Sequence, residues 1–227
     1  MLKRDVYFFR VLLLLLVGGL TACGNQAFSV KHLAKSDVDM VTDVVVADTR
    51  RQLMLLMDKL YKRNPRQLAK TPGMTAERRK LMIFDTAKAL VFKELKGLQE
   101  VEAMNLAFEK SFKGDRVFAL MVGLTGMVRQ SYGYNEEFFL NDELDAQKLY
   151  NSARNIEVMA WKLKNQPTDK DMIITSKLNG VIDNTSFERL YGKLIQKQDL
   201  MAKVIADRDS RTIKTVIQSG LSVFLPI

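Results

Sequence analysis

The chain has 227 residues, of which 47% are hydrophobic and 27% are charged, a composition that is typical of a globular protein and excludes a disordered one. Basic residues outnumber acidic ones by 35 to 26, which gives a formal net charge of +9. The basic residues are not interleaved with aromatic ones as in a nucleic-acid-binding patch, so we expect no nucleic-acid partner. With only 4 prolines and 12 glycines, the chain leaves room for long helices.

The first 22 residues have the pattern of a secretory signal. Three basic residues outweigh Asp5 before an apolar run from Val11 to Leu20. A run of about 10 residues is too short to cross a bilayer as a helix, which takes about 20. A positive start, a short apolar core and small residues at its end therefore predict a signal peptide over residues 1–22.

The signal ends in Leu20-Thr21-Ala22-Cys23, an aliphatic residue, two small ones and the only cysteine of the chain. This tetrapeptide resembles the lipobox of bacterial lipoproteins. The resemblance implies that Cys23 receives an S-linked diacylglycerol, that the chain is cut before it, and that its new amino group is acylated. Two or three acyl chains anchor a protein stably, since each buried methylene contributes about 0.8 kcal/mol. The alternative is a secreted protein with an ordinary cleavage site and an incidental cysteine.

Gly24-Asn25 follows the cysteine, in place of the aspartate that tends to retain such lipoproteins in the inner membrane of bacteria with two membranes. The resemblance therefore implies an outer-membrane anchor with the protein facing the periplasm. In a Gram-positive source the protein would lie outside the cytoplasmic membrane. Removing residues 1–22 leaves 205 residues and lowers the net charge to +7, because the signal carries three basic residues and one acidic residue. No second apolar stretch approaches 18 residues, so we expect no membrane span there.

Residues 23–35 are polar and show no period, which predicts a tether between the lipid and a single helical domain over residues 36–227. Ser36 is expected to cap the first helix, which the apolar spacing extends to about Arg63. Within this helix, Val44-Val45-Val46 would also suit a strand.

Three further helices are expected before residue 130. The apolar spacing indicates one from Ala76 to Lys96 and another from Val101 to Phe112. The most apolar segment, Val117–Val128, suits a buried helix, and Gly123 and Gly126 would let another helix approach it closely. The alternative for this segment is a hairpin that binds a partner or inserts into a membrane.

Ser131–Leu140 is predicted to be a loop rich in aromatic residues. Four of them are candidates for contact with an envelope protein partner: Tyr132, Tyr134, Phe138 and Phe139. The alternative is that these side chains cover one end of the core.

Asn141-Asp142-Glu143 is expected to cap a helix that runs to Leu163, in which apolar residues recur at steps of four and three. Asn179-Gly180 favours a short β-hairpin near residues 172–184, with a helix that ends at the glycine as the alternative. A last long helix is predicted from the capping box that begins at Thr185.

Arg189, Lys193 and Lys197 line one side of this last helix at i+4 spacing. They are candidates for contact with an anionic membrane surface, where each cation contributes about 1 kcal/mol. An ordinary solvated basic face is the alternative. Together these elements predict an all-α protein, an irregular antiparallel helical bundle with short connections.

Patterns that indicate catalysis are missing. The single histidine, His32, lies in the tether and Cys23 carries the lipid, which excludes His-based triads and Cys nucleophiles and removes the usual zinc ligands. The pairs Glu136-Glu137 and Asp142-Glu143 would be the carboxylates of a glycan-cleaving enzyme, but such pairs usually lie in solvated loops and helix starts. We therefore expect no catalytic residue, no metal and no cofactor other than the lipid.

Two non-catalytic functions remain for a membrane-anchored lipoprotein. The first is an accessory or scaffolding role in the cell envelope, in which the protein docks onto an envelope partner. The second is the binding of a lipid or another apolar ligand between helices that are rich in Met and Phe, at 12 residues each.

Overall fold

A computed structural model describes residues 34–86, 89–165, 177–178, 181–182 and 185–208. The chain divides into two units, Met1–Ala34 and Lys35–Ile227, and the fold below is that of the second unit. The signal peptide, Cys23 and His32 lie outside the described residues.

Helix α3 (Asp37–Arg63) begins where the sequence indicates. The Ser36 hydroxyl accepts a hydrogen bond from the Asp39 N–H at 3.2 Å, and the Asp39 carboxylate accepts one from the Ser36 N–H at 2.7 Å. This capping box satisfies backbone donors that a helix start leaves unpaired. The valines at positions 44–46 are helical, which excludes a strand there. At 1.5 Å per residue, α3 is about 40 Å long.

The helix expected from Ala76 to Lys96 is shorter in the structure. The one-turn helix α4 (Pro65–Leu68) precedes this range, which itself holds the helix α5 (Ala76–Phe84) and the 3-10 turn η1 (Lys93–Leu95). The guanidinium of Arg50 donates to the carbonyl of Phe84, which supplies a donor to the last turn of α5 from another element. Lys96 and Gly97 then turn the chain with φ of 58° and 75°, at the position where the predicted helix ends.

Helices α6 (Glu100–Phe108) and α7 (Arg116–Ser131) pack closely against each other at a glycine. A Cβ at Gly123 would lie 2.4 Å from the Met104 backbone nitrogen and 2.5 Å from the Glu100 carbonyl oxygen, so only glycine allows this approach. The residues of α7 from Arg116 to Val128 are all buried, which places this segment inside the bundle.

Helix α6 ends at Phe108 and not at Phe112 as predicted. The buried guanidinium of Arg116 donates to the carbonyls of Ala107 and Phe112, at 2.7 and 2.9 Å. These carbonyls therefore have a side-chain donor and do not need a continued helix.

Helix α8 (Ala146–Asn165) begins later than predicted, because Asp145 supplies its first acceptors. The Gln147 N–H donates to the Asp145 carboxylate at 2.8 Å, and the Leu149 N–H donates to the Asp145 carbonyl at 3.2 Å. Asp142, which was expected to cap this helix, accepts instead from the Phe139 N–H within the loop.

A two-residue strand pair follows α8 within the range where the sequence left a hairpin open. Strand β1 (Lys177–Leu178) pairs antiparallel with β2 (Val181–Ile182), and Asn179-Gly180 lies outside the described residues. Helix α9 (Ser186–Arg208) comes next. Lys59 of α3 bonds to Ser186, and Asp48 pairs with Lys197, so α3 and α9 run antiparallel.

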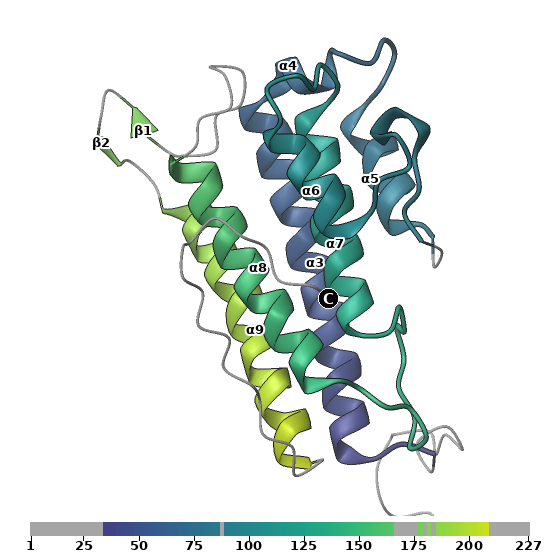
Figure 1. Ribbon diagram of the computed structural model, residues 1–227. Helices are drawn as coiled ribbons and strands as arrows, with labels where there is room; N and C mark the ends of the chain where they lie inside the picture. Colours follow the sequence, from purple (N-terminus) through teal and green to yellow (C-terminus); the bar gives the residue numbers. More distant parts are fainter. Residues whose placement is uncertain (1–33, 87–88, 166–176, 179–180, 183–184, 209–227) are drawn as a thin grey trace, which may run out of the picture. The chain divides into compact units, whose positions relative to one another are not determined.

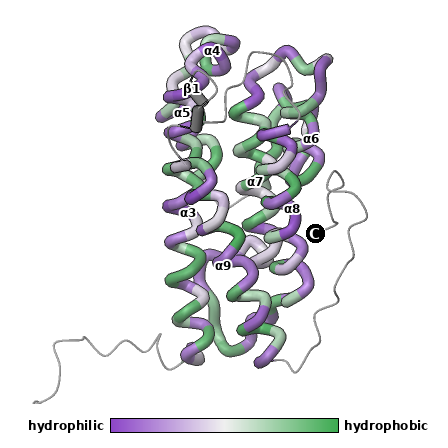
Figure 2. The backbone as a smooth tube through the Cα atoms, turned by 90° about the vertical axis from the view of Figure 1, so that its left-hand side faces the viewer, coloured by the Kyte–Doolittle hydropathy of each residue, from purple (hydrophilic) through white to green (hydrophobic). Residues whose placement is uncertain are grey.

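The fold is all-α apart from this strand pair, as the sequence predicts, with the core between α3, α7, α8 and α9 and with α6 against α7 (Figure 1). Hydrophobic and hydrophilic stretches alternate along α3, α8 and α9 in Figure 2, as expected of helices that bury one face. Among the described helices, none has the length and apolar character needed to cross a membrane.

Candidate functional site

A narrow pocket lies between α3, α5 and α7, and the loop after α7 contributes to its rim. Its apolar wall is built from side chains of all three helices: Val46, Leu53, Ile83, Phe84 and Val128. With its open mouth included, the pocket has about 470 Å³ of empty space. Most of this space is open solvent at the mouth. The part that a water-sized molecule can enter is about 40 Å³, room for a few waters and far below the roughly 300–1,000 Å³ of sites for drug-sized ligands.

Three buried hydroxyl groups in this pocket have no hydrogen-bond partner in the described part of the chain. They belong to Thr49 on α3, Thr125 on α7 and Tyr132 at the end of α7, and the three residues are 2%, 1% and 2% exposed. An unsatisfied buried hydroxyl costs about 1–3 kcal/mol, and native proteins contain few of them. Each oxygen is also almost fully shielded from solvent, so the three hydroxyls lie in the wall of the pocket and not in its open space.

The same pocket is lined by two cationic side chains, Arg50 and Arg129, and by the single carboxylate of Glu136. Burial lowers the pKa of Arg129, an effect that Glu136 and Tyr134 oppose and Arg50 reinforces. A lowered pKa means that the surroundings disfavour the charged guanidinium relative to water.

A second buried polar cluster, near the other end of α3, has its groups paired with one another. The Tyr61 hydroxyl donates to the Asp115 carboxylate at 2.8 Å, and the same carboxylate accepts from the Phe118 N–H at 2.9 Å. Arg79 forms an ion pair with Glu94, and its Nε lies 3.4 Å from Asp115. Burial raises the pKa of Tyr61, and Asp115 raises it further. This cluster joins α3, α5, η1 and α7, so we assign it to the fold.

The four candidate aromatic contact residues are divided between the core and its edge. Tyr132 and Phe138 are buried and contact each other edge to face, with ring centroids 6.2 Å apart, so they are not available to a partner. Tyr134 and Phe139 are half-buried, and the Tyr134 hydroxyl bonds to Glu100. The predicted contact surface is therefore reduced to these last two residues.

Lys35, the last residue of the predicted tether, is part of the fold. Its ammonium pairs with Asp43, lies 3.0 Å from the Glu137 carboxylate and lies 4.6 Å from the centroid of the Phe139 ring. Burial opposes the charge of Lys35, but Asp43 and Glu137 together raise its pKa above the ordinary value. The charged side chain thus fixes the start of the helical unit to the loop after α7.

Of the three predicted anionic-surface residues on α9, two are exposed. Arg189 and Lys193 face solvent, whereas Lys197 is paired with Asp48 of α3. The hydrogen bond from Lys197 lowers the pKa of Asp48. Arg51 lowers it further, whereas burial acts in the opposite direction and raises it. Lys197 therefore connects two helices and is not available for contact with a membrane surface.

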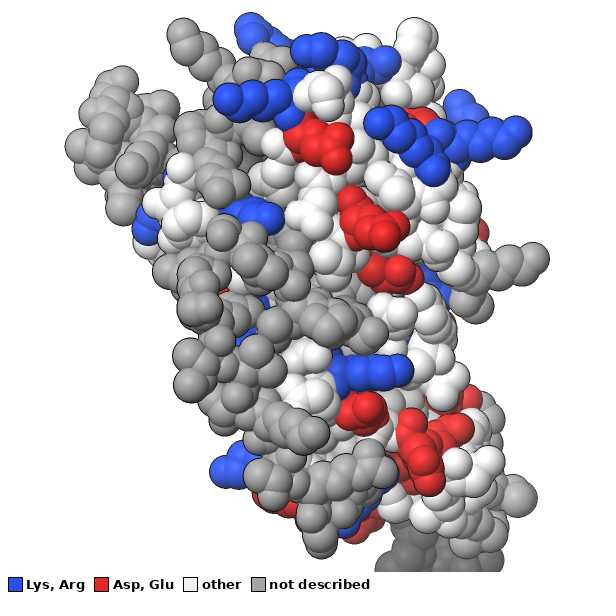
Figure 3. Space-filling model, viewed as in Figure 1, with Lys and Arg blue, Asp and Glu red and all other residues white. Residues whose placement is uncertain are grey.

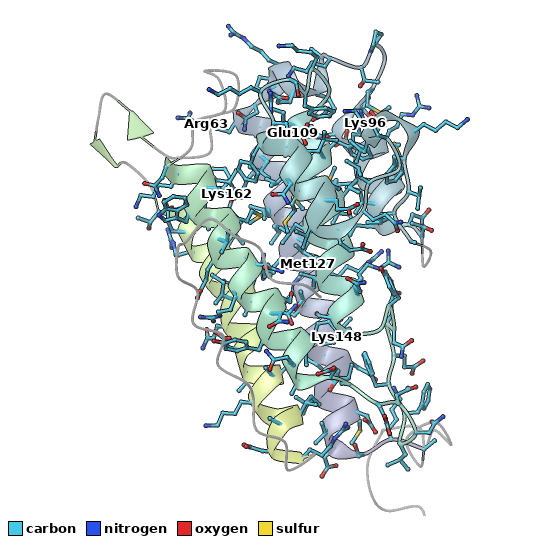
Figure 4. All side chains as sticks on the ribbon, in the orientation of Figure 1. Arg63, Lys96, Glu109, Met127, Lys148 and Lys162 are labelled. Atoms are coloured by element: carbon cyan, nitrogen blue, oxygen red, sulfur yellow. The ribbon has the colours of Figure 1, made fainter. Side chains whose placement is uncertain are left out.

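A larger basic surface, which sequence reasoning did not identify, lies where α3 ends; we call it the basic end. Its exposed members come from α3, α4 and the turns beside them: Lys62, Arg63, Arg66, Lys70, Lys96, Lys110 and Lys113. The ammonium of Lys70 donates to the Gly114 carbonyl, which brings two of these turns together. Figure 3 shows Lys and Arg gathered at this end, and Figure 4 shows Arg63, Lys96 and Glu109 there, with Lys148 toward the opposite end.

The carboxylates of the two predicted pairs lie in different surroundings. Glu137 pairs with Lys35, Asp142 binds the Phe139 N–H, Glu143 is exposed, and Glu136 lies in the lining of the pocket. In the described ranges, no three His, Cys, Asp or Glu side chains are grouped so that they could hold a metal ion.

Two of the polar residues that line the pocket were already candidates from the sequence. Tyr132 was predicted to contact a protein partner, and Glu136 was one of the paired carboxylates. Thr125 carried a usable signal, because it is the one side chain with a hydroxyl in the apolar run Val117–Val128. Thr49 and Arg50 lie in a polar part of α3 that reads as an ordinary solvated face.

Compared with models of protein families, with curated proteins and with solved structures, the chain gives no match.

Proposed function

We propose that this protein is a lipoprotein of the bacterial cell envelope, anchored by lipid on Cys23, with a non-catalytic accessory role in which its basic end docks onto an acidic face of another envelope protein. In a bacterium with two membranes, the anchor lies in the outer membrane and the helical unit faces the periplasm. The lipobox Leu20-Thr21-Ala22-Cys23 supports the anchor.

The docking role rests on where the basic end lies relative to the point at which the tether enters. The tether joins the helical unit at Lys35, directly before α3, whereas the basic end surrounds the other end of that helix. The two are separated by the length of α3, about 40 Å. A charged surface this far from the attachment point favours a partner other than the lipid leaflet that holds the anchor.

Charge determines which kind of partner fits the basic end. The basic end has seven exposed cations. Of the acidic side chains near them, Glu109 is exposed and Glu94 is already paired with Arg79, so the positive charge of this surface is in excess. Complementary charges accelerate association and select partners, and their effect falls as salt screens them over about 10 Å. Therefore we expect the partner to present carboxylates, and we expect the complex to weaken with ionic strength.

Charge reversal tests this role in the full-length protein in its own cells. Lys62→Glu, Arg66→Glu and Lys113→Glu together should abolish a cross-link to one defined envelope protein that the wild type forms. The matched control makes the same charge change elsewhere, with Lys148→Glu, Lys193→Glu and Lys203→Glu, and should retain the cross-link. The docking proposal fails if both triple variants keep the cross-link, or if the wild type is cross-linked to lipid alone.

The pocket between α3, α5 and α7 favours a second candidate function. Its apolar wall supports a helical lipoprotein that binds a lipid or another apolar ligand between its helices. This function does not require the basic end, so the two roles can be tested separately.

A further inference from the structure

We propose that the C-terminal segment of this chain, residues 209–227, folds back onto an exposed apolar strip between α3 and α9 and covers it. The strip lies at the end of the helical unit where the tether joins, away from the basic end. It consists of four residues of α3 and two of α9: Met40, Val41, Val44, Ala47, Leu200 and Val204. The proposal goes beyond the proposed function and does not depend on the lipid anchor.

The two helices bring their parts of the apolar strip together because they run antiparallel. Asp48 of α3 pairs with Lys197 of α9. Val44 lies about one helical turn before Asp48, and Leu200 lies about one turn after Lys197, so this register places Val44 and Leu200 beside each other. The next turn of each helix adds the pair Val41 and Val204.

The apolar strip is exposed to an extent that calls for a covering element. Val41, Val44 and Leu200 are 51%, 69% and 52% exposed. Single exposed aliphatic side chains are ordinary on a protein surface, whereas a contiguous group of them marks a contact site. Each methylene that leaves water contributes about 0.8 kcal/mol, so covering the strip is favourable.

Residues 209–227 begin beside the apolar strip and are long enough to cover it. Asp209 directly follows the last residue of α9, only five positions after Val204. The strip spans about 11 Å of α3, whereas the segment would extend over about 28 Å as a helix. The segment therefore reaches the strip without crossing any other element.

The sequence of this segment has the pattern that such a contact requires. Asp209 and Ser210 are residues that favour a turn and a helix N-cap. Ile213, Val216 and Ile217 follow at the spacing of one helix face, which predicts an amphipathic helix with an apolar side. This apolar side complements the exposed aliphatic side chains of the strip.

A segment of the same chain fits the apolar strip better than a separate molecule does. A stable interface between two proteins takes about 20–30 residues from each side, far more than the strip provides. A covalently linked segment has an effective concentration of the order of millimolar, so a weak apolar contact is enough to hold it. Exposed charges of both signs border the strip in equal number, which gives an anionic lipid surface no electrostatic attraction: Asp37, Lys203, Asp207 and Arg208.

Engineered cysteine pairs test the proposal on residues 23–227 with Cys23→Ala, a chain that contains no other cysteine. Folding back from Asp209 brings Ile217 level with Leu200 and Val44. Val44→Cys with Ile217→Cys should form an intramolecular disulfide in a glutathione buffer at least about tenfold more readily than Lys148→Cys with Ile217→Cys. Lys148 is the matched control, because it is also exposed at this end, six residues before the Arg154 that pairs with Asp199 of α9.

Two double variants of the segment itself complete the test. Adding Ile213→Asp and Val216→Asp should lower disulfide formation by Val44→Cys with Ile217→Cys to the level of the Lys148 control. Thr212→Asp and Thr215→Asp add the same charge on the other side of the predicted helix and should leave it unchanged. Equal disulfide formation from Val44 and Lys148, or equal effects of the two aspartate pairs, would overturn the proposal. Disulfide-linked dimers of Val44→Cys as the main product would assign the strip to a second copy of the chain and overturn it as well.

Discussion

Two buried tyrosines of this protein have opposite surroundings. The Tyr61 hydroxyl donates to the Asp115 carboxylate, whereas the Tyr132 hydroxyl has no partner among the described residues. Burial raises the pKa of both hydroxyls, so each remains protonated across the usual pH range. The same chemical group is therefore bound to a carboxylate at one site and left unsatisfied by the described residues at the other.

Removing these two hydroxyls should affect the free energy of unfolding differently. Tyr61→Phe should lower the free energy of unfolding by about 1.5–3 kcal/mol, because Asp115 loses a donor to a buried charge. Tyr132→Phe should leave it unchanged or raise it slightly, because the hydroxyl that disappears is unsatisfied. Urea denaturation of the ligand-free chain measures both. A loss of more than 1 kcal/mol in Tyr132→Phe would show that its hydroxyl has a partner within the protein.

At the scale of the helices, the sequence predicted the elements whose ends are set by local chemistry. The start of α3 follows from the Ser36 capping box, and the close approach of α6 to α7 follows from Gly123. The ends that were wrong depend on residues distant in the chain. Arg50 binds the last turn of α5, and Arg116 takes the carbonyls beyond α6. The apolar periodicity of a segment cannot predict where its helix ends when the end is set by a side chain from a distant part of the chain.

The pocket could not be predicted for the same reason. Thr49, Thr125 and Tyr132 are far apart in the sequence and come together only because α3 and α7 run antiparallel. The basic end is likewise assembled from separate turns. The charge stripe on α9 was visible in the sequence, but the pairing of Lys197 with Asp48 was not.

The crossing of α6 and α7 gives a prediction with an internal control. Gly123→Ala should destabilise the protein by about 1–3 kcal/mol, because the new methyl would overlap the backbone of Met104 and Glu100. Gly126→Ala lies three residues along the same helix, where a Cβ would come no closer than 3.6 Å to its nearest neighbour. It should be neutral or stabilising by up to about 1 kcal/mol, since alanine favours helix. Thermal denaturation distinguishes the two, and equal effects would contradict the crossing geometry.

The contact between α3 and α9 gives a prediction about pH. Lys197 lowers the pKa of Asp48 in the folded protein, so this pair stabilises the fold above the ordinary pKa of aspartate, and the contribution is lost as the pH falls through the lower folded value. Asp48→Asn should therefore cost about 0.5–1 kcal/mol at pH 7 and nothing once Asp48 is protonated in both states. Urea titrations at pH 7 and at pH 2.5 measure the difference.

Asp207→Asn serves as the control for this experiment, because Asp207 is an exposed residue in the last turn of α9. It should show no comparable loss at neutral pH. A deficit of Asp48→Asn that does not shrink at all between pH 7 and pH 2.5 would mean that the side chain acts through packing and not through its charge.

The proposed whole molecule has an N-terminal lipid anchor and a helical unit whose two ends differ in charge and in their distance from the tether. Lys35 fixes the tether side of the unit to the loop after α7, and the basic end lies at the other end of α3. In the proposed function, the lipid anchor on Cys23 attaches the chain to the membrane on the tether side, so the anchor is the premise of the whole arrangement.

Intact mass spectrometry of the full-length protein, purified from the membranes of its own cells, tests that premise most directly. The account predicts a chain that begins at Cys23 and carries the added mass of a diacylglycerol and an acyl group. A variant with an ordinary secretory signal in place of residues 1–22 and with Cys23→Ala should be released from the membrane fraction without acyl mass. A wild-type protein that has no acyl mass, or a variant that stays membrane-bound at the wild-type level, would contradict it.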